Sequence, residues 1–371
     1  MAMLSTYPPT ECGIATFSRS LAAAISDQGT TVNIVRLMNG DNSQSPQEVI
    51  HQHRDSRDTL LTRATLNSHQ AVIVQHEFGI YGGLDGAEIL EILDAVSVPI
   101  IVVVHTVLTR PTPHQRYIFS QLINKADALI TMTNTGKVKL LAHYDVDPRI
   151  VHVIPHGAHQ INNQSWMGTK ARPRILTWGL LGPGKGIEWA IDAMKSLRDE
   201  YGITPMPEYL IAGETHPQVK RHTGESYRTS LLDRIHLHDL TEDVSLVNQY
   251  LDQAALARLI ASADIVVLPY DSREQVTSGV LVEALTAGKP IISTNFPHAR
   301  EVLSDGTGIL VNQNDSRAIA DGLKSLLRDP DGLARMQKRA EKKGNGYVWS
   351  NIGQQYVTLA GTLANSKSLA S

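Results

Sequence analysis

The chain has 371 residues, of which 42% are hydrophobic and 19% charged, so it is long enough for two globular domains with buried cores. Its formal net charge of −3 argues against a nucleic-acid partner or an anionic membrane surface. A lone cysteine, Cys12, excludes an internal disulfide and fits a reducing compartment. The longest apolar run, at 98–104, is too short to span a bilayer, and no signal-peptide pattern opens the chain. We therefore expect a soluble cytoplasmic protein without stable membrane insertion.

The first half of the chain alternates short apolar runs with segments of helical periodicity. The apolar runs predict strands at 1–7, 31–37, 71–74, 99–104, 128–132 and 150–154. The periodic segments predict helices at 14–28, 60–68, 87–95, 114–125 and 134–143. Residues 41–58 are polar and irregular, which predicts a surface excursion. The 99–104 run lacks polar residues and should be a central strand covered on both faces.

A polar stretch at 162–172 predicts a linker, after which the alternation restarts. Strands are expected at 174–178, 209–212, 244–247, 265–268, 291–292 and 308–311. Helices are expected at 188–197, 226–237, 251–261, 279–286, twice within 316–343, and at 349–364. Strands alternating with crossover helices predict an α/β fold of two doubly wound, Rossmann-like domains facing each other across a cleft.

The stretch 263–294 predicts a strand, a polar loop, a helix and a second strand. Ser278 should cap the helix at 279–286, because its hydroxyl can accept a backbone N–H. A helix N-terminus at the carboxyl end of a strand suits a phosphate. Glu283 lies about one turn inside and could accept hydrogen bonds from a sugar hydroxyl. An ordinary βαβ unit with a solvated Glu283 is the alternative.

A glycine-rich turn, GLLGPGKG at 179–186, follows another predicted strand. It lacks the Lys-Ser/Thr ending of a P-loop. Its glycines, including Gly184, and Lys185 beside a helix N-terminus nevertheless suit a diphosphate. A tight turn with a solvated lysine is the alternative.

The first half offers polar residues at strand ends. The loop TECGIATF carries Gly13, which permits close backbone approach by a ligand. The segment QHEFGIYGG places His76, Glu77 and Tyr81 on a glycine-rich loop, and His105 ends the central strand. Structural histidines are the alternative. The chain has no GxSxG motif, no HExxH or other metal-ligand spacing among its 15 histidines, and no clear carboxylate pair for glycoside hydrolysis. These parts fit a transferase whose leaving group is a nucleotide diphosphate.

Taken together, four motifs resemble the retaining family 4 glycosyltransferases, which have the two-domain GT-B fold. The segments are TYPPTECGIATFSRSLA, VIPHGA, GLLGPGKG and QVTSGVLVEALTAGKPIIST, and the resemblance covers nearly the whole chain. It implies an N-terminal acceptor-binding domain at 1–160 and a C-terminal nucleotide-sugar donor-binding domain at 161–348. It also implies that a C-terminal helix, about 349–371, crosses back onto the first domain.

The resemblance assigns roles by position. Lys185 would bind the donor diphosphate, Glu283 the ribose, and His105 the donor sugar. The implied catalytic residues are His105, Lys185 and Gln275. The implied donor-binding residues are Gly13, Gly184, Lys185, Arg273, Thr277, Ser278, Gly279, Val280, Glu283, Asn248 and Tyr250. The implied acceptor-binding residues are His76, Glu77, Tyr81 and Thr16.

Two positions depart from the family pattern. The motif arginine is Leu180 here, so Arg273, another cation or a divalent metal such as Mg²⁺ would have to supply its charge. The fold itself requires no cofactor. The first motif glutamate is Gln275, since 283 − 8 = 275. The amino-acid sequence of these motifs resembles that of actinobacterial mannosyltransferases, which implies mannose transfer from GDP-mannose to a saccharide-type acceptor. A UDP-glucose-dependent glucosyltransferase, a nucleotide-sugar epimerase of similar shape and a binding protein without turnover are the alternatives.

Overall fold

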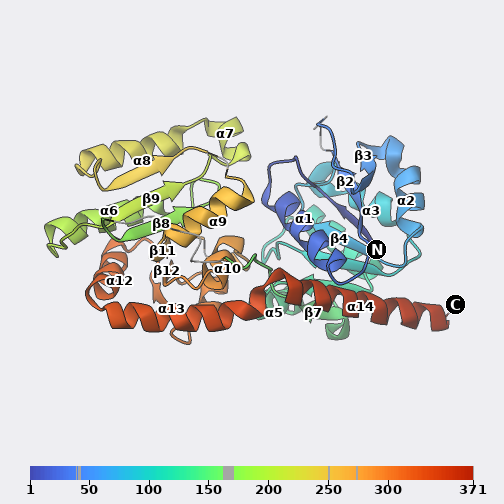
Figure 1. The fold of residues 1–371 in the computed structure, drawn as a ribbon. Coiled ribbons are helices and arrows are strands. Elements are labelled where there is room, and N and C mark those ends of the chain that lie inside the picture. The colour runs from blue at the N-terminus through green and yellow to red at the C-terminus, as the bar shows by residue number, and fades with distance from the viewer. Residues whose placement is uncertain (39, 41–42, 162–170, 250, 273–274, 371) are drawn as a thin grey trace. The chain divides into compact units, whose positions relative to one another are not determined.

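The structure is a computed structural model, which describes residues 1–38, 40, 43–161, 171–249, 251–272 and 275–370. The chain divides into two compact units (Figure 1). The first unit comprises Met1–Gly157 and Trp349–Ser371, and the second comprises Ala158–Val348. Most of the expected linker, 162–170, lies outside the described residues.

The first unit is built on a parallel sheet with the strand order β3-β2-β1-β4-β5-β6-β7. Its strands are β1 (Ala2–Ser5), β2 (Asn33–Leu37), β3 (Val49–His53), β4 (Val72–His76), β5 (Ile100–Val104), β6 (Ala128–Thr131) and β7 (Val151–Val153). Its helices are α1 (Gly13–Ser26), α2 (Thr59–Asn67), α3 (Glu88–Leu93), α4 (Pro113–Lys125), α5 (Asn134–His143) and α14 (Trp349–Ala370).

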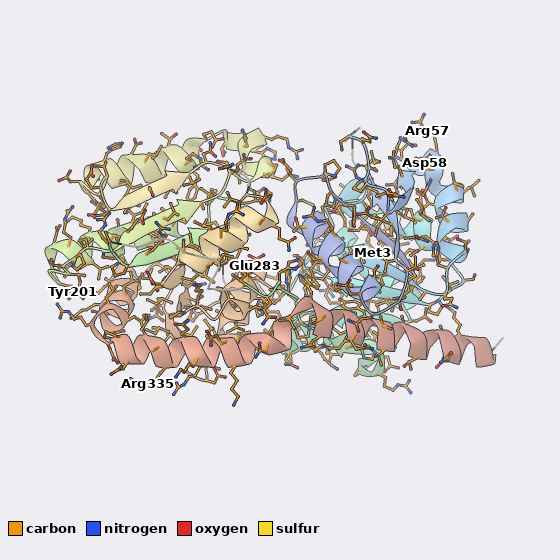
Figure 2. The ribbon with its side chains drawn as sticks, viewed as in Figure 1. Met3, Arg57, Asp58, Tyr201, Glu283 and Arg335 are labelled. Atoms are coloured by element: carbon orange, nitrogen blue, oxygen red, sulfur yellow. The ribbon has the colours of Figure 1, made fainter. Side chains whose placement is uncertain are left out.

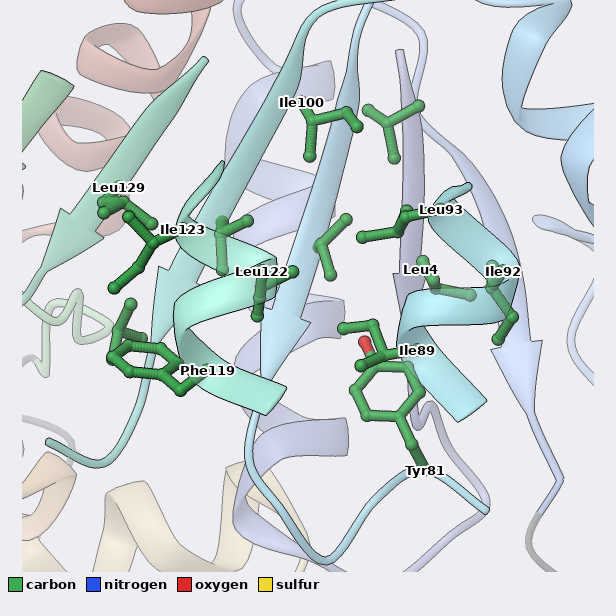
Figure 3. Close-up of a cluster of buried hydrophobic side chains, with 14 of the residues drawn as sticks. Leu4, Tyr81, Ile89, Ile92, Leu93, Ile100, Phe119, Leu122, Ile123 and Leu129 are labelled. Atoms are coloured by element: carbon green, nitrogen blue, oxygen red, sulfur yellow. The ribbon is translucent and has the colours of Figure 1, made fainter. Parts of the chain in front are cut away.

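Both faces of this sheet are buried. Because successive side chains of a strand point to opposite faces, Leu4 of β1 joins one core cluster and its neighbour Met3 joins the other. Figure 3 shows the Leu4 cluster, which α3 and α4 cover. The last helix α14 runs beside α1 and adds Tyr356 to the Met3 cluster (Figure 1). The two helices meet closely at Gly353, where a Cβ would lie 2.5 Å from the carbonyl oxygen of Ala24.

The second unit repeats the plan with a parallel sheet in the order β10-β9-β8-β11-β12-β13. Its strands are β8 (Arg174–Trp178), β9 (Glu208–Ala212), β10 (Val244–Val247), β11 (Ile265–Leu268), β12 (Ile291–Thr294) and β13 (Gly308–Val311). Its helices are α6 (Ile187–Asp199), α7 (Pro217–Thr223), α8 (Ser226–Leu237), α9 (Gln253–Ser262), α10 (Gly279–Thr286), α11 (Pro297–Leu303), α12 (Ser316–Arg328) and α13 (Pro330–Gly344).

The expected fold class, two doubly wound α/β domains, is confirmed, with local differences. The predicted surface excursion at 41–58 contains the edge strand β3, whose polar sequence VIHQH hides the pattern of a buried strand. The short helices α7 and α11 were not expected, because each spans only seven residues and shows little periodicity. The expectation that the two domains face a cleft stays a prediction.

Candidate functional site

The second sheet reverses its strand order between β8 and β11, so the loops that follow these two strands meet at one point of the sheet edge. Ligands of open α/β sheets bind at such a switch point. The glycine-rich turn follows β8 and is hydrogen-bonded to the segment after β11. The carbonyl of Gly184 accepts a hydrogen bond from the Asp271 amide at 3.0 Å. Gly186 has φ +63°, and a Cβ there would lie 1.9 Å from the carbonyl oxygen of Pro269, so only glycine fits.

Lys185 is a cation without a carboxylate partner among the described residues. Its Nζ lies 4.5 Å from the ring centroid of Tyr270, and burial lowers the pKa of its ammonium. A cation on an aromatic face keeps some stabilisation but no neutralising charge. Lys185 is therefore arranged to receive an anion.

The N-terminus of α10 lies against the same turn. Gly179 comes within contact distance of Val280, since a Cβ on Gly179 would lie 3.5 Å from Val280 Cγ2. The Ser278 hydroxyl caps the helix by accepting the Leu281 amide at 3.2 Å, as predicted. The N–H groups of Gly279 and Val280 have no acceptor among the described residues, which leaves them available to an anion.

Glu283 lies on α10, about one turn after these free N–H groups, and its position is labelled in Figure 2. Its Oε2 accepts a hydrogen bond from the indole Nε1 of Trp178 at 2.9 Å. Burial raises the pKa of its carboxyl to about 7, and the hydrogen bond from Trp178 opposes this rise. A half-ionised acceptor with one fixed oxygen can receive hydroxyl donors with the other.

The remaining predicted donor-binding residues fall on the loop before α10 and directly after β10. Gln275 donates from Nε2 to the carbonyl of Thr277 at 3.1 Å, so the loop is closed on itself. Arg273 and Tyr250 lie outside the described residues. Asn248 is exposed just beyond β10, which is separated from β8 by β9. Its role stays a prediction.

In the first unit, His105 ends β5 beside the switch point between β1 and β4. Its Nε2 lies 2.7 Å from Oε1 of Gln75, and its ring meets that of Phe17 edge-on at 5.0 Å. Burial, with smaller contributions from His156 and His76, lowers its pKa to about 3. The ring is neutral at physiological pH, and Nδ1 is its acceptor when Nε2 donates to Gln75.

Two residues that the resemblance assigns to the acceptor, His76 and Tyr81, are buried in the first unit. His76 does not lie on the loop but is the last residue of β4, where its ring is 1% exposed and stacks on Phe119 at 5.1 Å. Tyr81 is 6% exposed, its hydroxyl donates to the carbonyl of Gln75 at 2.7 Å, and its ring fills the core (Figure 3). The strand runs two residues further than predicted because Gln75 and His76 pair with Val103 and Val104 of β5.

The other first-unit candidates remain accessible. Glu77 accepts hydrogen bonds from the Phe78 amide at 3.1 Å and from the Thr106 hydroxyl, and burial raises the pKa of its carboxyl. Thr16 is exposed in the first turn of α1. A Cβ on Gly13 would meet no atom of the described residues within 4 Å, so space for a ligand remains above this backbone.

Three residues next to the candidates escaped prediction from the sequence: Gln75, Trp178 and His298. Each contacts its partner across 20 to 105 positions of the chain. Trp178 directly precedes the glycine-rich turn, which is the one local signal that could have singled it out. Among the described residues no group of three metal-ligating side chains occurs, and no helix there has the length and apolarity to cross a membrane.

The second unit thus places a cation and free helix N–H groups at the switch point of a parallel sheet, where the ligands of open α/β sheets bind. Comparison with known protein families identifies the family of this chain. Residues 12–159 match the model described as Glycosyltransferase Family 4, and residues 162–343 match that described as Glycosyl transferases group 1. The chain therefore belongs to the glycosyltransferase family that these two models describe.

Individual relatives agree with this family. A D-inositol 3-phosphate glycosyltransferase of Corynebacterium glutamicum is 25% identical over 64% of this chain and 58% of its own length. A phosphatidyl-myo-inositol mannosyltransferase of Mycobacterium leprae is 35% identical over 35% of this chain and 34% of its own. The sucrose-phosphate synthase structure from Thermosynechococcus elongatus shares the fold, with a TM-score of 0.77, 16% identity and coverage of 98% and 99%. The chain spans a little over half the length of the first curated relatives it matches.

Proposed function

We propose that this protein is a retaining hexosyltransferase that moves a sugar from a nucleotide diphosphate to a saccharide-type acceptor. The observation that carries the proposal is Lys185, a cation without a carboxylate partner among the described residues, on the turn after β8 that packs against Val280 at the N-terminus of α10. These groups would bind the donor diphosphate and stabilise the charge that develops on it as it leaves. Glu283, one turn further, would accept hydrogen bonds from the ribose.

The first unit would hold the sugar and the acceptor. His105, with a neutral ring, would hydrogen-bond the donor sugar, and Gly13 would allow its close approach. Glu77 and Thr16 would contact the acceptor, whereas buried His76 and Tyr81 would support them from behind.

We favour mannose from GDP-mannose as the donor, because a mannosyltransferase is among the relatives with higher identity. UDP-glucose is the alternative donor. The relatives' names also suggest an inositol-containing acceptor. Mg²⁺ could supply the charge that the motif arginine would carry at Leu180, and removal of divalent metal with EDTA would test this. We expect the protein to act in the cytoplasm.

The donor is tested by a thermal-shift screen of GDP- and UDP-sugars, followed by assay of released nucleotide with and without a saccharide or inositol-phosphate acceptor. Acceptor-dependent release of GDP from GDP-mannose is expected. Interconversion of the nucleotide sugar without release would instead identify an epimerase, and binding without any turnover would identify a binding protein. Release of UDP alone would replace mannose by the glucosyl alternative.

Replacement of His105 by alanine is expected to lower kcat about tenfold while nucleotide affinity stays within about twofold. The loss corresponds to one neutral hydrogen bond to the sugar, which lies away from the nucleotide. Steady-state kinetics and calorimetric titration with GDP and UDP measure the two effects. Loss of nucleotide binding itself would remove His105 from the sugar end of the site.

Replacement of Trp178 by phenylalanine is expected to weaken nucleotide binding about tenfold, because Glu283 loses the donor that fixes its carboxylate. Calorimetric titration measures the change. Affinity in the Trp178 variant equal to that of the wild type would show that the contact between Trp178 and Glu283 does not support binding.

A further inference from the structure

The segment Gln275–Ser278, which leads into α10, is held at both ends by one residue of another helix. The Ser278 amide donates to Nδ1 of His298 at 2.8 Å, and the His298 amide contacts the carbonyl of Gln275 at 3.4 Å. His298 lies in the first turn of α11 and is 1% exposed. The segment from Gln275 to Ser278 is therefore clamped between these two contacts.

The clamp explains why the Ser278 amide can be buried. A buried N–H without an acceptor is costly, and no α-helical carbonyl serves the residue that caps a helix. Nδ1 of His298 accepts this N–H, so the ring proton lies on Nε2. The contact leaves Gly279 and Val280 as the first free N–H groups of α10 among the described residues, and it fixes the direction in which they point.

The same segment supports the other half of the phosphate site. Phe296, two residues before His298, stacks on Tyr270 with the ring centroids 5.3 Å apart. Tyr270 in turn lies 4.5 Å below the ammonium of Lys185. Residues 296–298 thus carry both the ring that stacks on Tyr270 and the side chain that binds the Ser278 amide.

We propose that His298 is a positioning residue for the donor site, which sets the loop 275–278 and the free N–H groups of α10 in the geometry that receives the diphosphate. The inference rests on the proposed function, because the ligand is the nucleotide diphosphate of the donor. It requires an acceptor atom at the position of Nδ1, and not merely a side chain that fills the space.

This requirement can be tested with two amides of different length. In His298→Asn, the side-chain oxygen branches from Cγ as Nδ1 does and can replace it. In His298→Gln, the oxygen lies one atom further out and cannot reach the Ser278 amide from the same rotamer. Asparagine is expected to keep GDP and UDP affinity within about threefold of the wild type, and glutamine to lose about tenfold. His298→Ala should resemble glutamine.

Amide hydrogen exchange of the segment 275–282 gives a readout that needs no ligand. Exchange should be faster in the glutamine and alanine variants than in the wild type or the asparagine variant, with Tm recorded for each. Equal exchange and equal affinity in asparagine and glutamine variants would overturn the clamp. If alanine prevents folding, the asparagine and glutamine pair still decides. Failure of the wild type to bind any nucleotide would refute the proposed function. The comparison of amide exchange needs no nucleotide, so it would still decide whether His298 holds the segment 275–278.

Discussion

Replacing Lys185 by alanine is expected to lower turnover about a hundredfold. The ammonium has no carboxylate partner among the described residues and belongs to the turn that packs against the N-terminus of α10. It can therefore stabilise the negative charge that grows on the departing diphosphate. Removing one such preorganised group typically costs on the order of 3 kcal/mol of barrier, which corresponds to about two orders of magnitude in rate. Steady-state assay of released nucleotide measures the loss.

A matched lysine in the same unit serves as the control. Lys324 also lies over a tyrosine ring, with its Nζ 4.1 Å from the centroid of Tyr201, but it belongs to α12 and not to the loops at the switch point. Lys324→Ala should leave turnover unchanged. Near wild-type turnover in the Lys185 variant would remove this residue from the mechanism, since the loss of a cation–π contact alone is common to both.

Replacing Glu283 by glutamine is expected to raise the Tm of the ligand-free protein at pH 8 and to weaken nucleotide binding at least tenfold. The Tm should rise because the substitution removes a buried charge. Nucleotide binding should weaken because the substitution also removes the ionised acceptor of the ribose hydroxyls. Thermal denaturation at pH 5 and pH 8, and calorimetric titration at pH 8, measure them. The same stabilisation at both pH values would show that the carboxyl is not the source.

The direction in which the pKa of Glu283 shifts decides how the stability of the protein depends on pH. The pKa of Glu283 rises from 4.5 to about 7 in the folded protein, so the folded state binds the proton more tightly than the unfolded state. Stability contributed by this proton is full below pH 4.5 and is lost as the pH rises to about 7. The loss is on the order of 3 kcal/mol above that window. Nucleotide affinity should run the opposite way and increase from pH 6 to pH 8, because the ribose hydroxyls prefer the ionised carboxylate.

The sequence by itself determined the alternation of strands and helices and the residues that flank each turn. Apolar β-branched runs such as 100–104 indicate buried strands, and Ser278 before a periodic segment indicates a helix cap, and the structure confirms both. These signals depend on neighbouring residues only, so they can be interpreted without knowledge of the fold. Strand ends are less local, which is why His76 was expected on a loop although β5 pairs with it.

Only the tertiary structure decided which side chains meet and what burial does to them. Trp178 and Glu283 are 105 positions apart, and Ser278 and His298 are 20 apart, and no periodicity links either pair. Burial then changes what these side chains can do. It moves the pKa of Glu283 to about 7 and that of His105 to about 3, and it leaves His76 and Tyr81 with almost no exposed surface. Solvation and long-range contact are properties of the packed chain, so they become readable only after the sheets and helices have assembled.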